Sequence, residues 1–142
     1  GSACVACAAP SFKVARGEAV CSSCAAGEFY DTANTYVGTA DQCETCGDEY
    51  TSAAGTSGAS AQVACECAAG YGRSSTASAC VACTAPSFKI ASGDAVCSSC
   101  AAGEFYDTSA TYDGTTDQCT TCGDAYTSAP RTPAPIAHAA CA

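Results

Sequence analysis

The chain has 142 residues, a net charge of −9 and 15 cysteines, and it contains no Leu, Met or Trp. Its large aliphatic side chains are seven Val and two Ile, which excludes a conventional aliphatic core. Five Lys and Arg against 14 Asp and Glu exclude a nucleic-acid partner, and no apolar run is long enough for direct membrane insertion.

Cysteines come in closely spaced pairs along the whole chain. There are six Cys-x-x-Cys doublets and one Cys-x-Cys pair: Cys4/Cys7, Cys21/Cys24, Cys43/Cys46, Cys65/Cys67, Cys80/Cys83, Cys97/Cys100 and Cys119/Cys122. An aromatic residue follows each pair, and Gly27, Gly70 and Gly103 stand three residues after a cysteine. We expect each glycine to permit a tight turn and each aromatic ring to cover a disulfide as a miniature core.

Secondary structure is weakly indicated between these pairs. Short β-prone stretches occur around Phe29-Tyr30 and Tyr36-Val37, and no stretch has helical periodicity. Pro130, Pro133 and Pro135 predict an extended, exposed loop near the end of the sequence.

The sequence repeats itself after 76 residues. Ala3–Ala53 matches Ala79–Ala129 at 41 of 51 positions without a gap, and the match ends after Ala53. We therefore expect two cysteine-rich copies, residues 1–76 and an incomplete copy at residues 77–142, in an array whose units pack on their neighbours.

The pairing of the cysteines is predicted as a ladder in which the second Cys of each pair bonds the first Cys of the next pair. The expected bridges are Cys7–Cys21, Cys24–Cys43, Cys46–Cys65, Cys67–Cys80, Cys83–Cys97, Cys100–Cys119 and Cys122–Cys141. The alternative joins doublet to doublet, as in Cys4–Cys21 with Cys7–Cys24. In the ladder Cys4 has no partner within the sequence, so we expect it to bond a cysteine of a preceding copy or of a neighbouring subunit.

Other uses of these residues are weighed against the disulfide scaffold. Cys4, Cys7, Cys21 and Cys24 have the spacing of a zinc ribbon, and Cys21-Ser22-Ser23-Cys24 has that of a redox-active dithiol. Calcium could bind carboxylates that recur in both copies, namely Glu28, Asp31, Asp41, Asp48, Glu104, Asp107, Asp117 and Asp124. The single histidine, His138, lies in the Pro-rich stretch and has no evident nucleophile to activate. We expect no cofactor, no metal site and no catalytic residue.

The motif Cys-x-x-Gly-x-[Phe/Tyr], as in Cys24–Phe29 and Cys100–Phe105, resembles the ephrin-receptor-like cysteine-rich repeat. It is also similar to the smallest loop module of tumour-necrosis-factor receptors. The Ala-, Ser- and Thr-rich texture between the cysteines resembles the surface immobilisation antigens of ciliates and the cysteine-rich parts of flagellar hair proteins. These resemblances imply an architectural, extracellular role without catalytic residues.

The sequence therefore predicts a small disulfide-rich fold, an elongated tandem-repeat rod of stacked disulfide loops with sparse short β-strands and no helix-dominated core. We expect an extracellular or cell-surface structural subunit of a coat, flagellar hair or filament, which binds copies of itself and carries O-linked glycans. Phe29-Tyr30 and Phe105-Tyr106 are the expected assembly faces. The alternatives are a ligand-binding receptor ectodomain and, if the cysteines are reduced, a metal-binding protein.

Overall fold

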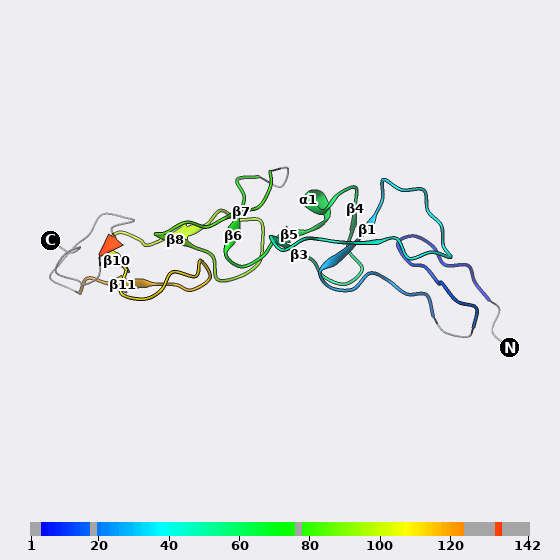
Figure 1. Ribbon diagram of the computed structural model, residues 1–142, viewed down its shortest axis with the longest axis horizontal. Helices are drawn as coiled ribbons and strands as arrows, with labels where there is room; N and C mark the ends of the chain where they lie inside the picture. Colours follow the sequence, from blue (N-terminus) through cyan, green and yellow to red (C-terminus); the bar gives the residue numbers. More distant parts are fainter. Residues whose placement is uncertain (1–3, 18–19, 76–77, 124–132, 135–142) are drawn as a thin grey trace. The chain divides into compact units, whose positions relative to one another are not determined.

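The computed structural model describes residues 4–17, 20–75, 78–123 and 133–134 (Figure 1). It divides into two compact units, Gly1–Glu66 and Cys67–Ala142. Strands of two to four residues make up most of the regular structure, and the one helix among the described residues, α1 (Ala61–Ala64), has four residues. The protein is a small disulfide-rich fold with short strands in small sheets, as the composition predicts.

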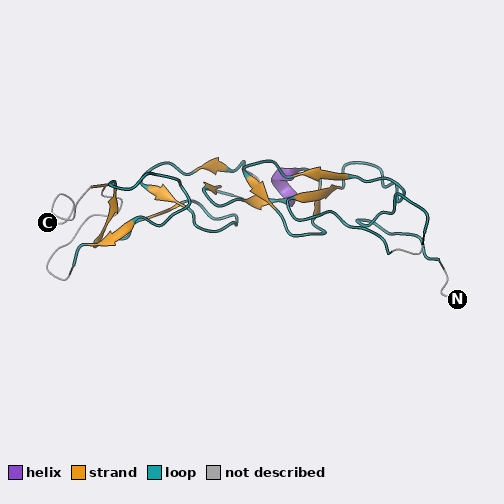
Figure 2. Ribbon diagram, turned by 60° about the horizontal axis from the view of Figure 1, so that its bottom comes forward, coloured by secondary structure: helices purple, strands orange, loops and turns teal. Residues whose placement is uncertain are grey.

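The first unit contains a three-stranded sheet around β1 (Glu28–Asp31), shown in Figure 2. On one side β1 pairs antiparallel with β2 (Cys43–Thr45), and on the other it pairs parallel with β4 (Ser57–Gly58). β3 (Tyr50–Thr51) and β5 (Glu66–Cys67) form a two-stranded sheet. Nearer the N-terminus, Phe12 and Ser22 form an isolated antiparallel bridge.

The second unit repeats the three-stranded sheet 76 residues later. Its three-stranded sheet consists of β11 (Cys119–Thr121), β10 (Glu104–Asp107) and β12 (Pro133–Ala134), with the same antiparallel and parallel pairings. Two hairpins complete it: β6 (Tyr71–Gly72) with β7 (Val81–Ala82), and β8 (Ser87–Phe88) with β9 (Ser98–Ser99). Both units have a parallel strand, although Ser57-Gly58 and Pro133-Ala134 share no residue. The parallel pairing is therefore kept where the sequences of the two copies no longer match.

Two expectations about the strands need correction. Tyr36-Val37 forms no strand, because the Cys24–Cys43 disulfide brings β2 to β1 and sets Tyr30 opposite Cys43. Tyr36 instead donates its hydroxyl to the carbonyl oxygens of Cys7 and Ser11, at 2.7 and 2.8 Å. The expected Pro-rich loop lies mostly outside the described residues, and within it Pro133-Ala134 is a strand.

The disulfides follow the expected ladder. Six join pairs of described residues: Cys7–Cys21, Cys24–Cys43, Cys46–Cys65, Cys67–Cys80, Cys83–Cys97 and Cys100–Cys119. Cys122 is also disulfide-bonded, and its expected partner Cys141 lies outside the described residues. The doublet-to-doublet alternative is contradicted, because Cys7 bonds Cys21 and leaves Cys4 as an exposed free thiol.

Sulfur and aromatic rings form the interior, while the aliphatic side chains lie outside. In the first unit Phe29 packs against Cys46 and Cys65, with Tyr50 and α1 alongside. Every Val and Ile among the described residues is exposed, namely Val5, Val14, Val20, Val37, Val63, Val81, Ile90 and Val96. The expected aromatic cover over a disulfide is therefore present, and the apolar surface of the protein is aliphatic.

This arrangement contradicts the assembly faces expected from the sequence. Phe29, Tyr30, Phe105 and Tyr106 are each at most 4% exposed. They lie at the centre of β1 and β10 and are buried within their own unit, so they have almost no surface left to offer a neighbouring molecule.

Because aromatic residues are buried and the valines are exposed, truncating a Phe should lower the free energy of unfolding more than truncating a Val. Replacing the buried Phe29 by Ala should lower the free energy of unfolding by about 3–5 kcal/mol, because the ring that covers Cys46–Cys65 is removed. The matched control, Val14→Ala, should change it by less than about 0.5 kcal/mol, because Val14 is exposed. Thermal unfolding of the oxidised proteins measures both, and equal effects would contradict the assignment of the interior.

Reduction of the disulfides should abolish the fold. With so few buried apolar side chains, full reduction and alkylation should leave a disordered chain even without denaturant. Circular dichroism and limited proteolysis before and after reduction give the comparison. Unchanged spectra and an unchanged digestion pattern would show that something other than the disulfides holds the protein together.

Candidate functional site

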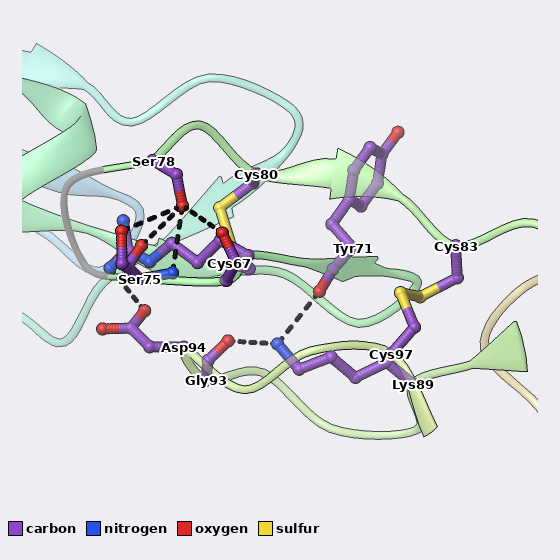
Figure 3. The surroundings of a disulfide bond; sticks show 12 residues. Cys67, Tyr71, Ser75, Ser78, Cys80, Cys83, Lys89, Gly93, Asp94 and Cys97 are labelled. Atoms are coloured by element: carbon purple, nitrogen blue, oxygen red, sulfur yellow. Dashed lines mark hydrogen bonds and ion pairs between the residues drawn. A yellow bond between two sulfur atoms is a disulfide. The ribbon is translucent and has the colours of Figure 1, made fainter. Parts of the chain in front are cut away.

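The segment Cys67–Arg73, called here the docked segment, is held by a disulfide, backbone hydrogen bonds and two buried cations. It begins the second unit and lies between β7 and the loop that follows β8 (Figure 3). The sequence period places residues 67–76 in the first copy, whereas their contacts place them with the second. The second unit thus starts with a segment that the sequence period assigns to the first copy.

A disulfide anchors one end of the docked segment. Cys67 bonds Cys80 with a Cα–Cα distance of 5.5 Å, and both cysteines are buried. The neighbouring Cys83–Cys97 bridge ties β7 to the loop on the other side, so both walls around the segment are covalently fixed (Figure 3).

Backbone hydrogen bonds hold the segment on both sides. Gly70 donates its N–H to the carbonyl of Lys89 at 2.8 Å and accepts from Cys83 at 2.7 Å. Cys67 accepts from the N–H of Gly93 at 2.9 Å, and Gly72 pairs with Val81 across the β6–β7 hairpin. These contacts depend on main-chain atoms, so they select the path of the backbone rather than particular side chains.

Two glycines make that path possible. Gly70 has a φ of +83°, a region that L side chains rarely adopt. At Gly72 an added Cβ would lie 2.6 Å from the backbone nitrogen of Cys97, which is closer than real Cβ atoms come. A side chain at position 72 would therefore push the docked segment away from the backbone of Cys97.

Two buried cations fasten the segment further. The Lys89 ammonium donates to the carbonyl of Tyr71 at 2.9 Å and to that of Gly93 (Figure 3). The guanidinium of Arg73 pairs with the carboxylate of Asp94, which is partly open to solvent. Both cations are less than 9% exposed. Removing a partner of such a buried charge is costly, so these contacts define one arrangement of the segment.

The sequence reasoning did not single out Lys89, Arg73 or Asp94. One signal was available, because Lys13 and Lys89 are equivalent residues in a chain with only five Lys and Arg. In the first unit Lys13 also donates to the carbonyl of Gly17, the residue equivalent to Gly93. A lysine retained in both copies of so acidic a protein points to a structural task for the cation.

The carboxylates considered for calcium serve the local backbone. Asp31, Asp41, Asp107 and Asp117 each accept the N–H of the residue two positions later. Glu28 and Glu104 accept an N–H three positions earlier, from Ala25 and Ala101. Asp48 is in an exposed turn, and Asp124 lies outside the described residues. Within the described residues, no group of three or more His, Cys, Asp and Glu side chains is arranged to hold a metal ion.

Asp113 is the carboxylate with the largest pKa shift. Hydrogen bonds from the hydroxyl and N–H of Thr116 and from the N–H of Thr115 lower its pKa to about 2. Because this folded-state pKa lies below the ordinary value, the carboxylate favours the folded turn at neutral pH. That contribution is lost as the pH falls from about 4 to about 2.

The alternative uses of the cysteines find no support in the geometry. Cys7, Cys21 and Cys24 are in disulfides, so the four-cysteine zinc arrangement with Cys4 is not formed. Cys21 and Cys24 belong to different bridges and therefore do not form a dithiol pair. His138 lies outside the described residues.

No protein-family model, curated protein sequence or solved structure matches the chain. The six disulfides indicate a secreted or extracellular protein, because cytosolic thiols are kept reduced. In the described part of the chain, no helix has the length and apolar character needed to cross a bilayer.

The close approach of Gly72 to the backbone of Cys97 can be tested in the intact protein. Gly72→Val should detach the segment, because the new side chain overlaps the backbone of Cys97. We expect a loss of about 1–3 kcal/mol in stability and faster amide exchange at Gly70 and Cys83. Val81→Ala, on the partner strand and exposed, is the control and should leave exchange unchanged. Equal exchange in both variants would contradict the close approach at Gly72.

Proposed function

We propose that the protein is a structural, non-catalytic subunit of an extracellular assembly, such as a coat, a flagellar hair or a filament. The observation that supports this most directly is the serial order of the disulfides. Each closes a loop of 13 to 19 residues in sequence separation, and only one or two residues separate one loop from the next. The chain is thereby divided into consecutive covalent rings.

Consecutive rings limit how far a chain can be stretched. From Cys7 to Cys119, a fully extended chain without bridges would reach about 380 Å at ~3.4 Å per residue. With the six bridges intact, force passes across each disulfide and along the short spacers, and the reach falls to about 80 Å. A protein built this way keeps its length under tension, which suits a load-bearing element of a cell surface.

The composition of the surface supports the same role. Exposed carboxylates, serines and threonines keep the units hydrated, and the hydroxyl side chains are the natural acceptors for O-linked glycans. Equivalent elements spaced by 76 residues would present equivalent surfaces at regular intervals. We propose that the partners are further copies of the same repeat, which is how a periodic assembly is made.

Mechanical measurement tests the load-bearing role. Pulled by its ends in a single-molecule force experiment, the oxidised protein should stop extending at about one-fifth of the Cys7–Cys119 contour that the reduced and alkylated protein reaches. Negative-stain imaging of native material should show a coat or filaments, and antibodies should label the outside of unpermeabilised cells. Isolated monomers inside cells, or equal extension of both forms, would overturn the proposal.

A further inference from the structure

The three disulfides of the second unit that join described residues differ in how far solvent reaches them. Cys67–Cys80 is closed, since its two cysteines are 0% and 8% exposed. In Cys83–Cys97 and Cys100–Cys119 the first cysteine is buried, whereas the second is partly exposed. A thiolate must reach a sulfur atom to exchange with a disulfide, so only these two bridges can be attacked in the folded protein.

The Cys83–Cys97 bridge opens onto a hollow of about 330 Å³, which both of its cysteines line. Val81 and Val96, 66% and 62% exposed, belong to the same wall. The buried cation Arg73, paired with Asp94, also lines the hollow, and none of the described residues that line it is acidic. A hollow of this size can hold a small molecule, and its charged wall is positive.

The Cys100–Cys119 bridge meets a hollow of the opposite charge. Cys119 lines a space of about 450 Å³ together with Asp107, Asp113 and Asp117. Among the described residues that line this second hollow there is no Lys or Arg. Three carboxylates around one sulfur repel an approaching anion, so exposure alone does not make this bridge reactive towards an anionic thiol.

We propose that the hollow at Cys83–Cys97 is an exchange site for a small anionic thiol, meaning a thiol that also carries a carboxylate. The positive wall around Arg73 admits such a molecule, while the carboxylates beside Cys119 turn it away and burial protects Cys67–Cys80. Cys83–Cys97 therefore opens first among these three bridges. The inference concerns the chemistry of one bridge and does not depend on the load-bearing role proposed above.

The covalent step is a thiol–disulfide exchange at Cys97, the more accessible sulfur of the pair. The incoming thiolate attacks the Cys97 sulfur, the bond between Cys97 and Cys83 breaks, and a mixed disulfide forms on Cys97. Cys83 leaves as a thiolate and takes a proton from water. Attack of the Cys83 thiolate on Cys97 reverses the step, restores the bridge and releases the small thiol, so no further oxidant or reductant is consumed.

Opening this bridge would loosen one wall around the docked segment. Cys83–Cys97 ties β7 to the loop that follows β8. From that loop, Lys89 accepts the N–H of Gly70 and Gly93 donates to Cys67. We expect faster amide exchange at Gly70 and Gly93 in the mixed disulfide, while the Cys67–Cys80 bridge still anchors the segment.

Two thiols of opposite charge test the site on the full chain. Glutathione is the anionic probe and cysteamine the cationic one, with Cys4→Ser in the protein so that no protein thiol competes. After quenching with N-ethylmaleimide, peptide mapping should find glutathione on Cys97 and maleimide on Cys83 at least about tenfold sooner than glutathione on Cys119. With cysteamine this ratio should fall at least about threefold, and high salt should bring the two probes together.

Charge substitutions at the hollow locate the site. Val81→Glu should slow the glutathione reaction at Cys97 about threefold, and Val81→Lys should accelerate it, because this exposed position lines the hollow. Ile90→Glu and Ile90→Lys are the controls, since Ile90 is 64% exposed and lies outside the lining. Equal effects of charge at positions 81 and 90 would overturn the exchange site.

The acidic hollow has its own variant, Asp113→Val, which introduces the residue that the first copy has at the equivalent position, Val37. It should speed the reaction of Cys119 with glutathione and slow that with cysteamine. Faster reaction with both probes would mean a loosened turn and would overturn the exclusion by charge. Glutathione appearing on Cys119 or on Cys67–Cys80 as early as on Cys97 would overturn the proposal as a whole.

Discussion

Each disulfide in this protein closes a short ring, and the next ring begins one or two residues later. The chain entropy that a hydrophobic core would otherwise have to overcome is removed from the unfolded state by these rings. What remains to be buried is small: the sulfur atoms and the aromatic ring that follows each cysteine pair. Phe29 on Cys46–Cys65 is the clearest example. The aliphatic side chains are consequently not needed inside.

Because disulfides and buried aromatic rings stabilise the fold, it needs little regular secondary structure. Strands of two to four residues are too short to stand alone, yet several of them contain or adjoin a bridged cysteine, as β2 and β5 do. In β1 the bridge from Cys24 fixes the position of Cys43, and the pairing of Tyr30 with Cys43 follows from it. The parallel pairing of β4 and of β12 tolerates unrelated residues because it is made by main-chain atoms.

The cysteine spacing was sufficient to predict the fold class and the connectivity, because neighbouring pairs can close only small loops. It was insufficient to predict which surfaces face outward. Phe29 and Tyr30 were expected at an assembly face because this stretch recurs unchanged in the second copy. Both are buried instead, and Phe29 packs against the Cys46–Cys65 disulfide. Nor could the period reveal that Cys67–Arg73 packs with the copy that follows it.

The docked segment shows how two structural requirements converge on the same residues. A backbone that must approach Cys97 closely needs glycine at position 72, and a buried chain turn needs glycine at position 70. The carbonyls left facing inward by this path need a donor, and the Lys89 ammonium supplies it. The first unit has the equivalent lysine, Lys13, and its ammonium donates to the carbonyl of Gly17, the residue equivalent to Gly93. The same cation therefore satisfies the carbonyl of an equivalent loop in both units, which explains why an acidic chain keeps a lysine at this position.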